Sequence, residues 1–348
     1  MEAVTRPEDH LGEPRESAQR EMVDIVTSLA KRRGFIYQSS EIYGGVNAIY
    51  DFGPHGVALR RNLRDLWWRH TVELRHDVVG IESSVIMHPR VWEASGHVQN
   101  FTDPLVDCRR CKSRFRADHL PTPRQVREDP ESLSIPLSAE AARVVKSARL
   151  AEDEPICPNC GAQDFSDARQ FNLMFKTYVG PVEDSAAQVF LRPETAQGMF
   201  VQFQNVINAT RKRIPFGIAQ IGKSFRNEIS PGNFIFRLRE FEQMELEFFV
   251  KPGSDSEWLQ YWRDQRMHWW TEVLGVSQNK IRARELEKEE LSHYAAGAFE
   301  VEPELFARGD GLLFAHHFFG YRVDVDRLAA EAEASGFERR ELEDVVDE

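Results

Sequence analysis

The stretch "FRNEISPGNFIFRLREFEQME", residues 225–245, decides the fold class of this chain. Two strand-like runs flank a Pro-Gly bend, a pattern that predicts a β-hairpin. Arg226, Arg237 and Arg239 lie on these runs, although the chain as a whole carries a formal net charge of −12. Three arginines on one hairpin of an acidic protein indicate a local site for an anion.

The second run of the hairpin alternates between polar and apolar residues. Successive side chains of a strand point to opposite faces, and the odd positions form a polar row that includes one aromatic residue: Arg237, Arg239, Phe241, Gln243, Glu245 and Glu247. The even positions include Phe236, Leu238, Met244, Leu246 and Phe248. Guanidinium groups and an aromatic ring suit a phosphate chain attached to a stackable base. A surface on which Arg and Glu neutralise each other across strands explains the pattern equally well.

The segments around the hairpin predict an α+β fold with antiparallel pairing. Strand-like runs over 188–195 and 216–229 lie on either side of a helical pattern over 194–213, and the hairpin follows. Further helices are expected from residue 19, from Pro54, and within 256–275.

Four cysteines occur as two CxxC pairs, Cys108 with Cys111 and Cys157 with Cys160. In a cytosolic chain this spacing indicates a closed, structural Cys₄ zinc site, with free thiols as the alternative. The residues between the pairs differ in composition from the rest, so we interpret 107–168 as a small insertion domain.

The chain shows no targeting or membrane signal. Residues 1–18 are polar and predict a disordered lead-in, and no apolar run is long enough to span a bilayer. The composition therefore predicts a cytoplasmic protein without membrane association. The acidic balance disfavours indiscriminate attraction to nucleic acid.

Two weaker features remain open at this point. Glu194, at a strand-to-helix junction, either caps the helix or receives an ammonium group. The short basic patches "CRRCKSRFR" and "TRKR" either contact tRNA or form a solvated surface. The sequence contains no P-loop or dinucleotide-binding glycine motif, so phosphate binding would use side chains on a sheet.

The hairpin resembles the ATP-binding hairpin of class II aminoacyl-tRNA synthetases. The segments "SSEIYGGVNAIYDFGPHGVALRRNL", "SGHVQNFTDPLVDC", "LRPETAQGMFVQF" and "FGIAQIGKSFRNEI" resemble the dimeric glycyl-tRNA synthetase family, and the similarity runs from about residue 21 to 302. The resemblance implies the class II α+β core, an antiparallel sheet flanked by helices, over 19–106 and 169–302. It also implies a homodimer formed largely through the helix that begins near Pro54.

The reaction that the resemblance implies has two steps. Glycine attacks the α-phosphate of Mg²⁺–ATP, which gives glycyl-adenylate and pyrophosphate, and tRNA(Gly) then accepts the glycyl group.

The resemblance also implies roles for individual residues. Arg226 would bind the α-phosphate, Glu228 would contact the adenine amino side, and Phe241 would stack on the adenine. Glu194 and Glu245 would face the ammonium group of glycine. The implied catalytic set is Arg226, Glu228, Arg237 and Arg239. The implied ATP-binding set adds Asn227, Phe236, Leu238, Glu240 and Phe241. The implied glycine-binding set is Arg116, Glu194, Phe241, Glu242, Gln243, Met244 and Glu245.

Residues 303–348 do not show the segments with which the family continues. These are an "EPSxGxDR" helix whose arginine covers the ATP and an anticodon-binding domain, so the core is expected to be incomplete here. Two alternatives follow. The chain is a non-catalytic paralogue or fragment that binds ATP or glycine or dimerises, or it makes an adenylate for an acceptor other than tRNA.

Overall fold

The computed structural model describes residues 25–128, 133, 135, 137–181, 183, 187–229, 234–235, 237–288, 290–291, 295–303 and 322–323. The chain forms two compact units. Unit 1 comprises Met1–Leu59, Asp103–Phe171 and Ile229–Ile235, and unit 2 comprises Arg60–Thr102, Asn172–Glu228 and Phe236–Glu348. The predicted lead-in 1–18, most of the Pro-Gly bend and Phe236 lie outside the described residues.

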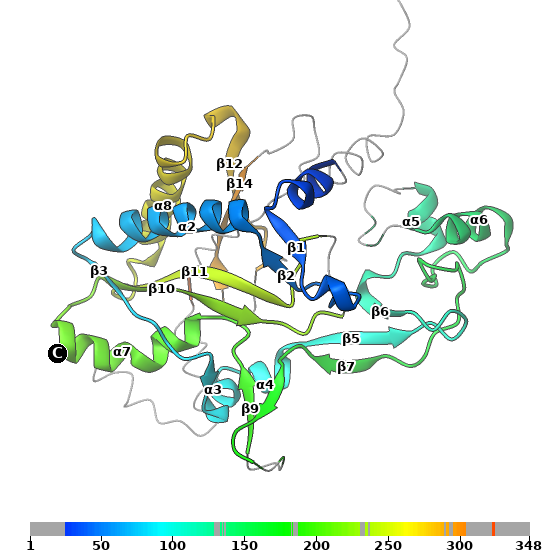
Figure 1. Ribbon diagram of the computed structural model, residues 1–348, viewed down its shortest axis with the longest axis horizontal. Coiled ribbons are helices and arrows are strands. Elements are labelled where there is room, and N and C mark those ends of the chain that lie inside the picture. The colour runs from blue at the N-terminus through cyan, green and yellow to red at the C-terminus, as the bar shows by residue number, and fades with distance from the viewer. Residues whose placement is uncertain are drawn as a thin grey trace, which may run out of the picture. The chain divides into compact units, whose positions relative to one another are not determined.

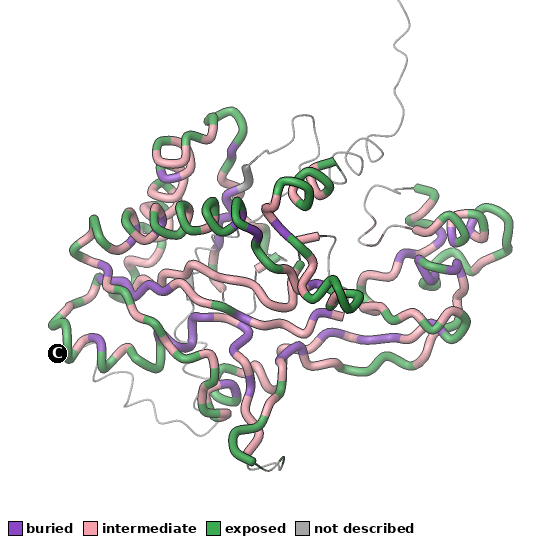
Figure 2. The backbone as a smooth tube through the Cα atoms, in the orientation of Figure 1, coloured by how far each residue is buried: buried purple, intermediate pink, exposed green. Residues whose placement is uncertain are grey.

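Unit 1 begins with a helix over 25–32, which lies within the helix expected from residue 19. Two short antiparallel strands follow, β1 (Ile36–Gln38) and β2 (Tyr50–Phe52), with the 3₁₀ turn η1 (Glu41–Tyr43) between them. Helix α2 (Pro54–Trp68) starts at the proline that the sequence indicated, since proline is tolerated where the first helical turn needs no amide donor. Its outward face is largely exposed (Figure 2).

The rest of unit 1 carries the cysteine pairs. Strand β5 (Thr102–Asp107) lies between β6 (Arg114–Arg116) and β7 (Arg169–Asn172), with β5 and β6 antiparallel. Three short helical elements follow β6: η3 (Ala117–His119), α5 (Pro123–Glu128) and α6 (Ala139–Ser147). The side chain of Ser138 caps α6 by accepting from the amide of Ala141.

Unit 2 is organised by the predicted hairpin (Figure 1). Strands β10 (Phe216–Phe225) and β11 (Glu240–Phe249) pair antiparallel along their whole length, with Phe216 opposite Phe249 and Phe225 opposite Glu240. The short strand β3 (Val78–Gly80) adds to β10 in parallel. The strand expected to start near residue 234 begins at Glu240, so Arg237 and Arg239 precede it.

An apolar cluster packs against each of the two faces of this sheet. Ala219 of β10 and Met244, Leu246 and Phe248 of β11 pack with tryptophans of α2 and of the helix that follows α8 (Asp255–His268). On the other face Phe216 and Ile218 pack against α7 (Ala196–Thr210). The even positions of β11 from Met244 onward therefore belong to the core, as the alternation predicted, and the odd positions share the face that α7 covers.

Two helices end, within unit 2, in a π-helical turn that the sequence did not predict. Helix α2 continues as η2 (Arg69–Glu73), and α8 continues as η5 (Trp269–Val273). In both, paired tryptophans at the junction pack into the same apolar cluster.

The remaining elements of unit 2 are short. Strand β9 (Gln188–Leu191) lies between β4 (Ile86–Met87) and β8 (Lys176–Tyr178) in an antiparallel sheet, beside helices α3 (Pro89–Ala94) and α4 (His97–Asn100). Strand β12 (Ile281–Glu285), which follows η6 (Gln278–Lys280), pairs with β14 (Phe299–Pro303), and β13 (Ala295–Gly297) pairs with β15 (Arg322–Val323). The α+β class and its antiparallel sheets are confirmed. Within the described part of the chain, no helix combines the length and the apolarity needed to cross a bilayer.

Candidate active site on the β10–β11 hairpin

The polar row of β11 faces the N-terminal end of α7. Gln243 accepts a hydrogen bond from the hydroxyl of Ser224 on β10 at 2.7 Å and donates to Oε1 of Glu245 at 3.1 Å. The backbone amide of Thr195, the residue before α7, donates to Oε2 of Glu245 at 3.1 Å, and its hydroxyl donates to the same oxygen. Helix N-termini favour negative charge, so α7 and the hairpin together fix the Glu245 carboxyl group.

Glu194 is held beside this row by two donors on one oxygen. Nε2 of Gln197 donates to Oε1 of Glu194 at 2.6 Å, and Nε2 of His97 lies 3.3 Å from the same atom. Neither of these two donors engages the other carboxylate oxygen, Oε2. Gln197 is itself buried, and its amide oxygen has no hydrogen-bond partner among the described residues. Buried acceptors in folded proteins almost always find a donor, from the protein, from water or from a bound molecule.

Arg226 is immobilised at the end of β10. Its Nε donates to the carbonyl oxygen of Pro193 at 3.0 Å. The guanidinium carbon lies 5.5 Å from the ring centroid of Phe101 and 5.3 Å from that of Phe241. The two rings hold the planar cation through cation–π contact.

A second arginine, Arg192, is buried under β10 and is only 2% exposed. Its Nε donates to the carbonyl of Lys223 at 2.7 Å, and one terminal nitrogen donates to the carbonyl and hydroxyl oxygens of Ser83 at 2.9 and 3.0 Å. This close approach requires glycine at 222, because a Cβ there would lie 2.2 Å from the guanidinium group. Burial lowers the pKa of Arg192, and the nearby Glu245 and Glu82 act in the opposite direction.

The carboxyl groups of this face differ in their pKa values. Burial raises the pKa of Glu247 to about 8, and the neighbouring charges of Glu245 and Glu194 add to the rise. Burial and Glu194 also raise the pKa of Glu245 to about 7, against the lowering effects of Thr195 and Arg226. Burial alone would raise the pKa of Glu194, but His97, Gln197 and Arg226 outweigh it and hold that pKa below its ordinary value. Glu194 is thus the carboxylate that stays ionised most easily.

Three of the predicted site residues point away from this face. The side chain of Glu242 forms ion pairs with Arg60 at 2.7 Å and Arg64 at 3.6 Å, both on α2. Met244 packs in the cluster with the tryptophans, and Glu240 pairs with Lys223. All three occupy even positions of β11, so the structure does not bring them together with Gln243 and Glu245.

The residues between the two strands form a second group. Arg237 lies 3.7 Å from the carboxylate of the buried Glu228, and Arg239 donates to the backbone carbonyl of Glu228 at 3.0 Å. The carbonyl of Arg239 accepts from the amide of Arg226 at 2.9 Å, which continues the strand pairing beyond β10. Asn227 is held through its backbone amide, and Leu238 lies in the same loop.

Arg116 belongs to unit 1. It ends β6, where its guanidinium group donates to both oxygens of Asp118 at 3.0 and 2.6 Å and lies 3.1 Å from Asp103. These carboxylates hold its orientation. Its predicted contact with glycine stays a prediction.

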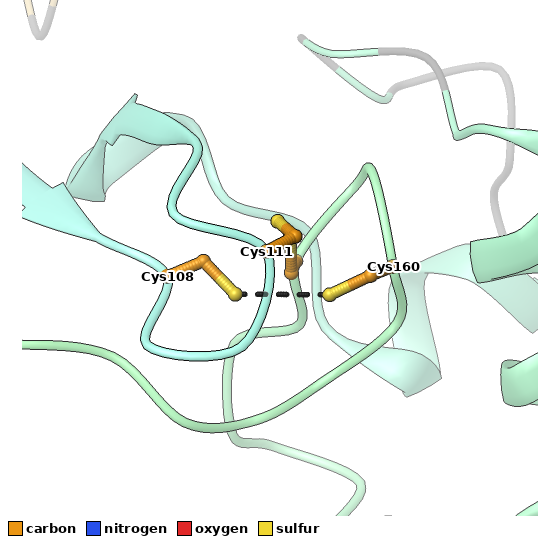
Figure 3. Close-up of side chains that lie close together, drawn as sticks. Cys108, Cys111 and Cys160 are labelled. Carbon is orange, nitrogen blue, oxygen red and sulfur yellow. Dashed lines mark hydrogen bonds between the residues drawn. The ribbon is translucent and has the colours of Figure 1, made fainter.

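The four cysteine thiols converge in unit 1, and Figure 3 shows three of them, Cys108, Cys111 and Cys160. Their sulfur atoms all lie within 4.8 Å of one another. Sγ of Cys108 lies 3.7 Å from that of Cys160, and Sγ of Cys111 lies 3.5 Å from that of Cys157. Four sulfurs at zinc–sulfur distance in a tetrahedron are separated by about 3.8 Å, so this cluster fits a zinc ion.

The arginines near the first CxxC pair mostly face carboxylates. Arg109 lies 3.6 Å from Asp164, and Arg110 lies 3.8 Å from Glu140. Arg114 donates to Asp107 at 2.8 Å. This supports the solvated-surface reading of that basic patch over contact with a polyanion.

Sequence reasoning missed several residues that shape this site: His97, Phe101, Arg192, Thr195 and Gln197. Each lies inside a segment that carried the family resemblance, but its role depends on a contact with a distant residue. His97, for example, reaches Glu194 across almost a hundred positions. No local pattern contains that information.

Comparisons with known proteins agree with this fold. A model of the family "tRNA synthetase class II core domain (G, H, P, S and T)" matches residues 175–332 and thus extends beyond residue 302. A crystal structure of prolyl-tRNA synthetase from Cryptosporidium parvum, complexed with halofuginone and AMPPNP, superposes with a TM-score of 0.50 at 11% identity. The superposition covers 81% of this chain and 40% of the prolyl-tRNA synthetase chain. Fold and family model together define a class II aminoacyl-tRNA synthetase core.

Sequence relatives narrow the class. The glycine–tRNA ligase of Treponema denticola is 51% identical over 81% of this chain, and that of Clostridium kluyveri is 49% identical over 94%. The chain belongs to the glycine–tRNA ligase family. It spans 56% of the Treponema protein, 60% of the relative from Caldanaerobacter subterraneus and 68% of the Clostridium protein.

Proposed function

We propose that this chain activates glycine with Mg²⁺–ATP to form glycyl-adenylate and transfers the glycyl group to tRNA(Gly). The observation that carries the proposal is the immobilised Arg226 beside two separately held carboxyl groups, Glu194 and Glu245. Attack of a carboxylate on a phosphate requires stabilisation of charge on the phosphate and precise placement of the amino acid. One face of the hairpin offers both.

The ammonium group of glycine would bind at Glu194 and Glu245. Oε2 of Glu194 is not engaged by Gln197 or His97, and the unpaired amide oxygen of Gln197 is a further acceptor. Three carboxyl groups and two arginines share this region, and burial together with mutual repulsion raises the pKa values of Glu245 and Glu247. A bound ammonium group would relieve that repulsion.

ATP would place its α-phosphate at the terminal nitrogens of Arg226. Phe241 would offer the remaining face of its ring to the adenine, since its other contact is with Arg226. Arg237 and Arg239, anchored through Glu228, would supply further positive charge to the phosphates. Glu242, Met244 and Glu240 would support the strand from its core face and would not contact glycine or ATP.

The cysteine cluster would hold a structural zinc ion. Burial raises the pKa values of the Cys157 and Cys160 thiols, whereas hydrogen bonds with Ser113 and the other cysteines bring the pKa of Cys111 down to about 6 despite its burial. Zinc binds thiolates, and its charge would stabilise the deprotonated form of all four. Because four protein ligands fill the tetrahedron, the ion would organise the insertion 107–168 and take no part in the reaction.

We further infer a homodimer. Unit 1 exposes a group of large apolar side chains on η1 and the first turns of α2: Ile42 and Tyr43 are each 87% exposed, Val57 51% and Leu59 59%. Apolar groups of this kind mark association surfaces. The proposed reaction would take place in the cytoplasm, where tRNA is charged.

Incubation of the purified chain with radioactive glycine, Mg²⁺–ATP and tRNA(Gly) tests the proposed function. We expect radioactivity to accumulate on the tRNA with labelled glycine and not with labelled alanine. Release of pyrophosphate in the presence of glycine without charging of the tRNA would contradict the transfer step and favour a different acceptor. Absence of both would favour the non-catalytic alternative.

A further inference from the structure

We propose that His97 is a positioning residue for recognition of the substrate ammonium group. It orients Glu194, and both His97 and Arg226 contact the ring of Phe101. This inference rests on the proposed function, since it concerns the same glycine site. His97 lies in α4, outside the hairpin.

The hydrogen bonds of His97 define its tautomer. Nε2 lies 3.3 Å from Oε1 of Glu194, and Nδ1 lies 2.8 Å from the hydroxyl oxygen of Ser95. An ionised carboxylate only accepts hydrogen bonds, so Nε2 carries the hydrogen. In the neutral imidazole Nδ1 is then the acceptor, and the Ser95 hydroxyl donates to it. Ser95 thus keeps the Nε2 hydrogen directed at Glu194.

The imidazole ring is also fixed by its neighbours. The ring of Trp92 lies 5.6 Å from it, at an interplanar angle of 77°, and that of Phe101 lies 5.4 Å from it, at 54°. Trp92 is fully buried, so the ring on that side is anchored in the core of unit 2. His97 therefore has little freedom to leave Glu194.

The contacts of the imidazole ring continue to Arg226, the residue proposed to bind the α-phosphate. Phe101 contacts both His97 and the guanidinium group of Arg226, which in turn lies over Phe241. Contacts between neighbouring side chains thus run without a break through Trp92, His97, Phe101, Arg226 and Phe241. These contacts link the carboxylate that would bind the ammonium group to the arginine that would bind the phosphate.

The consequence for binding is specific. His97 and Gln197 both occupy Oε1 of Glu194, which leaves Oε2 to the ligand. Without the His97 donor, the carboxylate can rotate about its terminal bond, and its charge is less well stabilised. Loss of His97 should weaken recognition of an ammonium group and have little effect on the adenosine part of a ligand.

Two synthetic ligands separate these effects. The first is glycyl-sulfamoyl-adenosine, a stable mimic of glycyl-adenylate, and the second is acetyl-sulfamoyl-adenosine, which lacks only the ammonium group. Calorimetry gives the Kd of each for the wild type, for His97→Ala, for His97→Gln, which restores a donor at the same reach, and for His268→Ala, a control at an exposed histidine of α8.

We expect His97→Ala to weaken the glycyl ligand by roughly 10-fold or more, the usual effect of removing a hydrogen bond to a charged group, and to leave the acetyl ligand unchanged. His97→Gln should recover most of the loss, and His268→Ala should match the wild type. Equal weakening of both ligands, or no weakening of either, would overturn the proposal.

The design separates this inference from the proposed function. Calorimetry requires no turnover, so a wild-type chain that prefers the glycyl ligand but charges no tRNA contradicts the proposed function and still tests His97. A wild-type chain that binds neither ligand, or binds both equally, overturns the inference about His97.

Discussion

Thr195 donates two hydrogen bonds to one carboxylate oxygen of Glu245, one from its backbone amide and one from its hydroxyl. Thr195 precedes α7 and Glu245 lies in the middle of β11, so this contact ties the helix to the hairpin. It also lowers the pKa of a carboxyl group that burial would otherwise raise further.

Removal of that hydroxyl should weaken glycine binding. Thr195→Val keeps the shape of the side chain and the backbone donor but removes one donor to a charged group, which is worth about 1.5–3 kcal/mol. We expect the KM for glycine to rise by roughly 10-fold or more and the KM for ATP to change little. Thr195→Ser, which keeps the hydroxyl, is the control. Equal KM values in the Val and Ser variants would show that the hydroxyl does not position Glu245.

Substitution of Arg226 by lysine should damage the reaction although the charge is kept. A lysine can neither donate to the Pro193 carbonyl in the same plane nor stack between Phe101 and Phe241. We expect about a 100-fold lower kcat for glycine-dependent turnover, as is typical of losing a fixed donor to a reacting oxyanion. Arg124→Lys, on the exposed ion pair with Asp153, should be unaffected. A fully active Arg226→Lys variant would remove Arg226 from the proposed reaction.

The pKa of Glu247 makes a prediction about stability. Burial raises this pKa to about 8 from an ordinary value of 4.5. As the pH rises, the Glu247 carboxyl group therefore ionises in the unfolded chain above about pH 4.5, whereas in the native state it stays protonated until about pH 8. The native state is therefore progressively destabilised, on the order of a few kcal/mol, until about pH 8. Glu247→Gln cannot ionise, so its Tm advantage over the wild type should be small at pH 5 and larger at pH 8. A Tm difference that is the same at both pH values would contradict the assigned burial.

The cysteine cluster predicts about one zinc ion per chain by elemental analysis. Cys157→Ser removes one of four ligands and should lose most of the metal. Hydrogen exchange should then increase over 107–168 and stay unchanged along β10 and β11, because the cysteines belong to unit 1 and the hairpin strands to unit 2. A wild-type chain with well under one zinc would exclude the metal site. Protection lost equally from β10 would show that the zinc also stabilises the hairpin.

Alternation within β11 was predictable from the sequence because it depends only on strand geometry. Met244, Leu246 and Phe248 lie in the core, and Gln243 and Glu245 lie on the opposite face, as the odd and even positions indicated. The same rule argues against Glu242 as a glycine contact, although the resemblance placed the whole run 241–245 at the site. Local periodicity was here more informative than position within a motif.

Other features could not be predicted because they arise from long-range pairing or local defects. The contacts of His97 with Glu194 and of Thr195 with Glu245 depend on how α4 and α7 meet the sheet. The π-helical turns η2 and η5 occur beside paired tryptophans of the apolar cluster, and helix propensity gives no signal for such turns. The start of β11 at Glu240 likewise reflects the loop that anchors Arg237 and Arg239 to Glu228.

The most direct test of the central claim is glycine-dependent exchange of labelled pyrophosphate into ATP, measured without tRNA on the wild type and on Glu194→Gln. The exchange reports adenylate formation alone, which is the step assigned to Arg226, Glu194 and Glu245. We predict exchange with glycine and none with alanine, and a rate at least ~10-fold lower in Glu194→Gln because the amide cannot pair with the ammonium group. A folded wild-type chain that shows no glycine-dependent exchange would contradict the account.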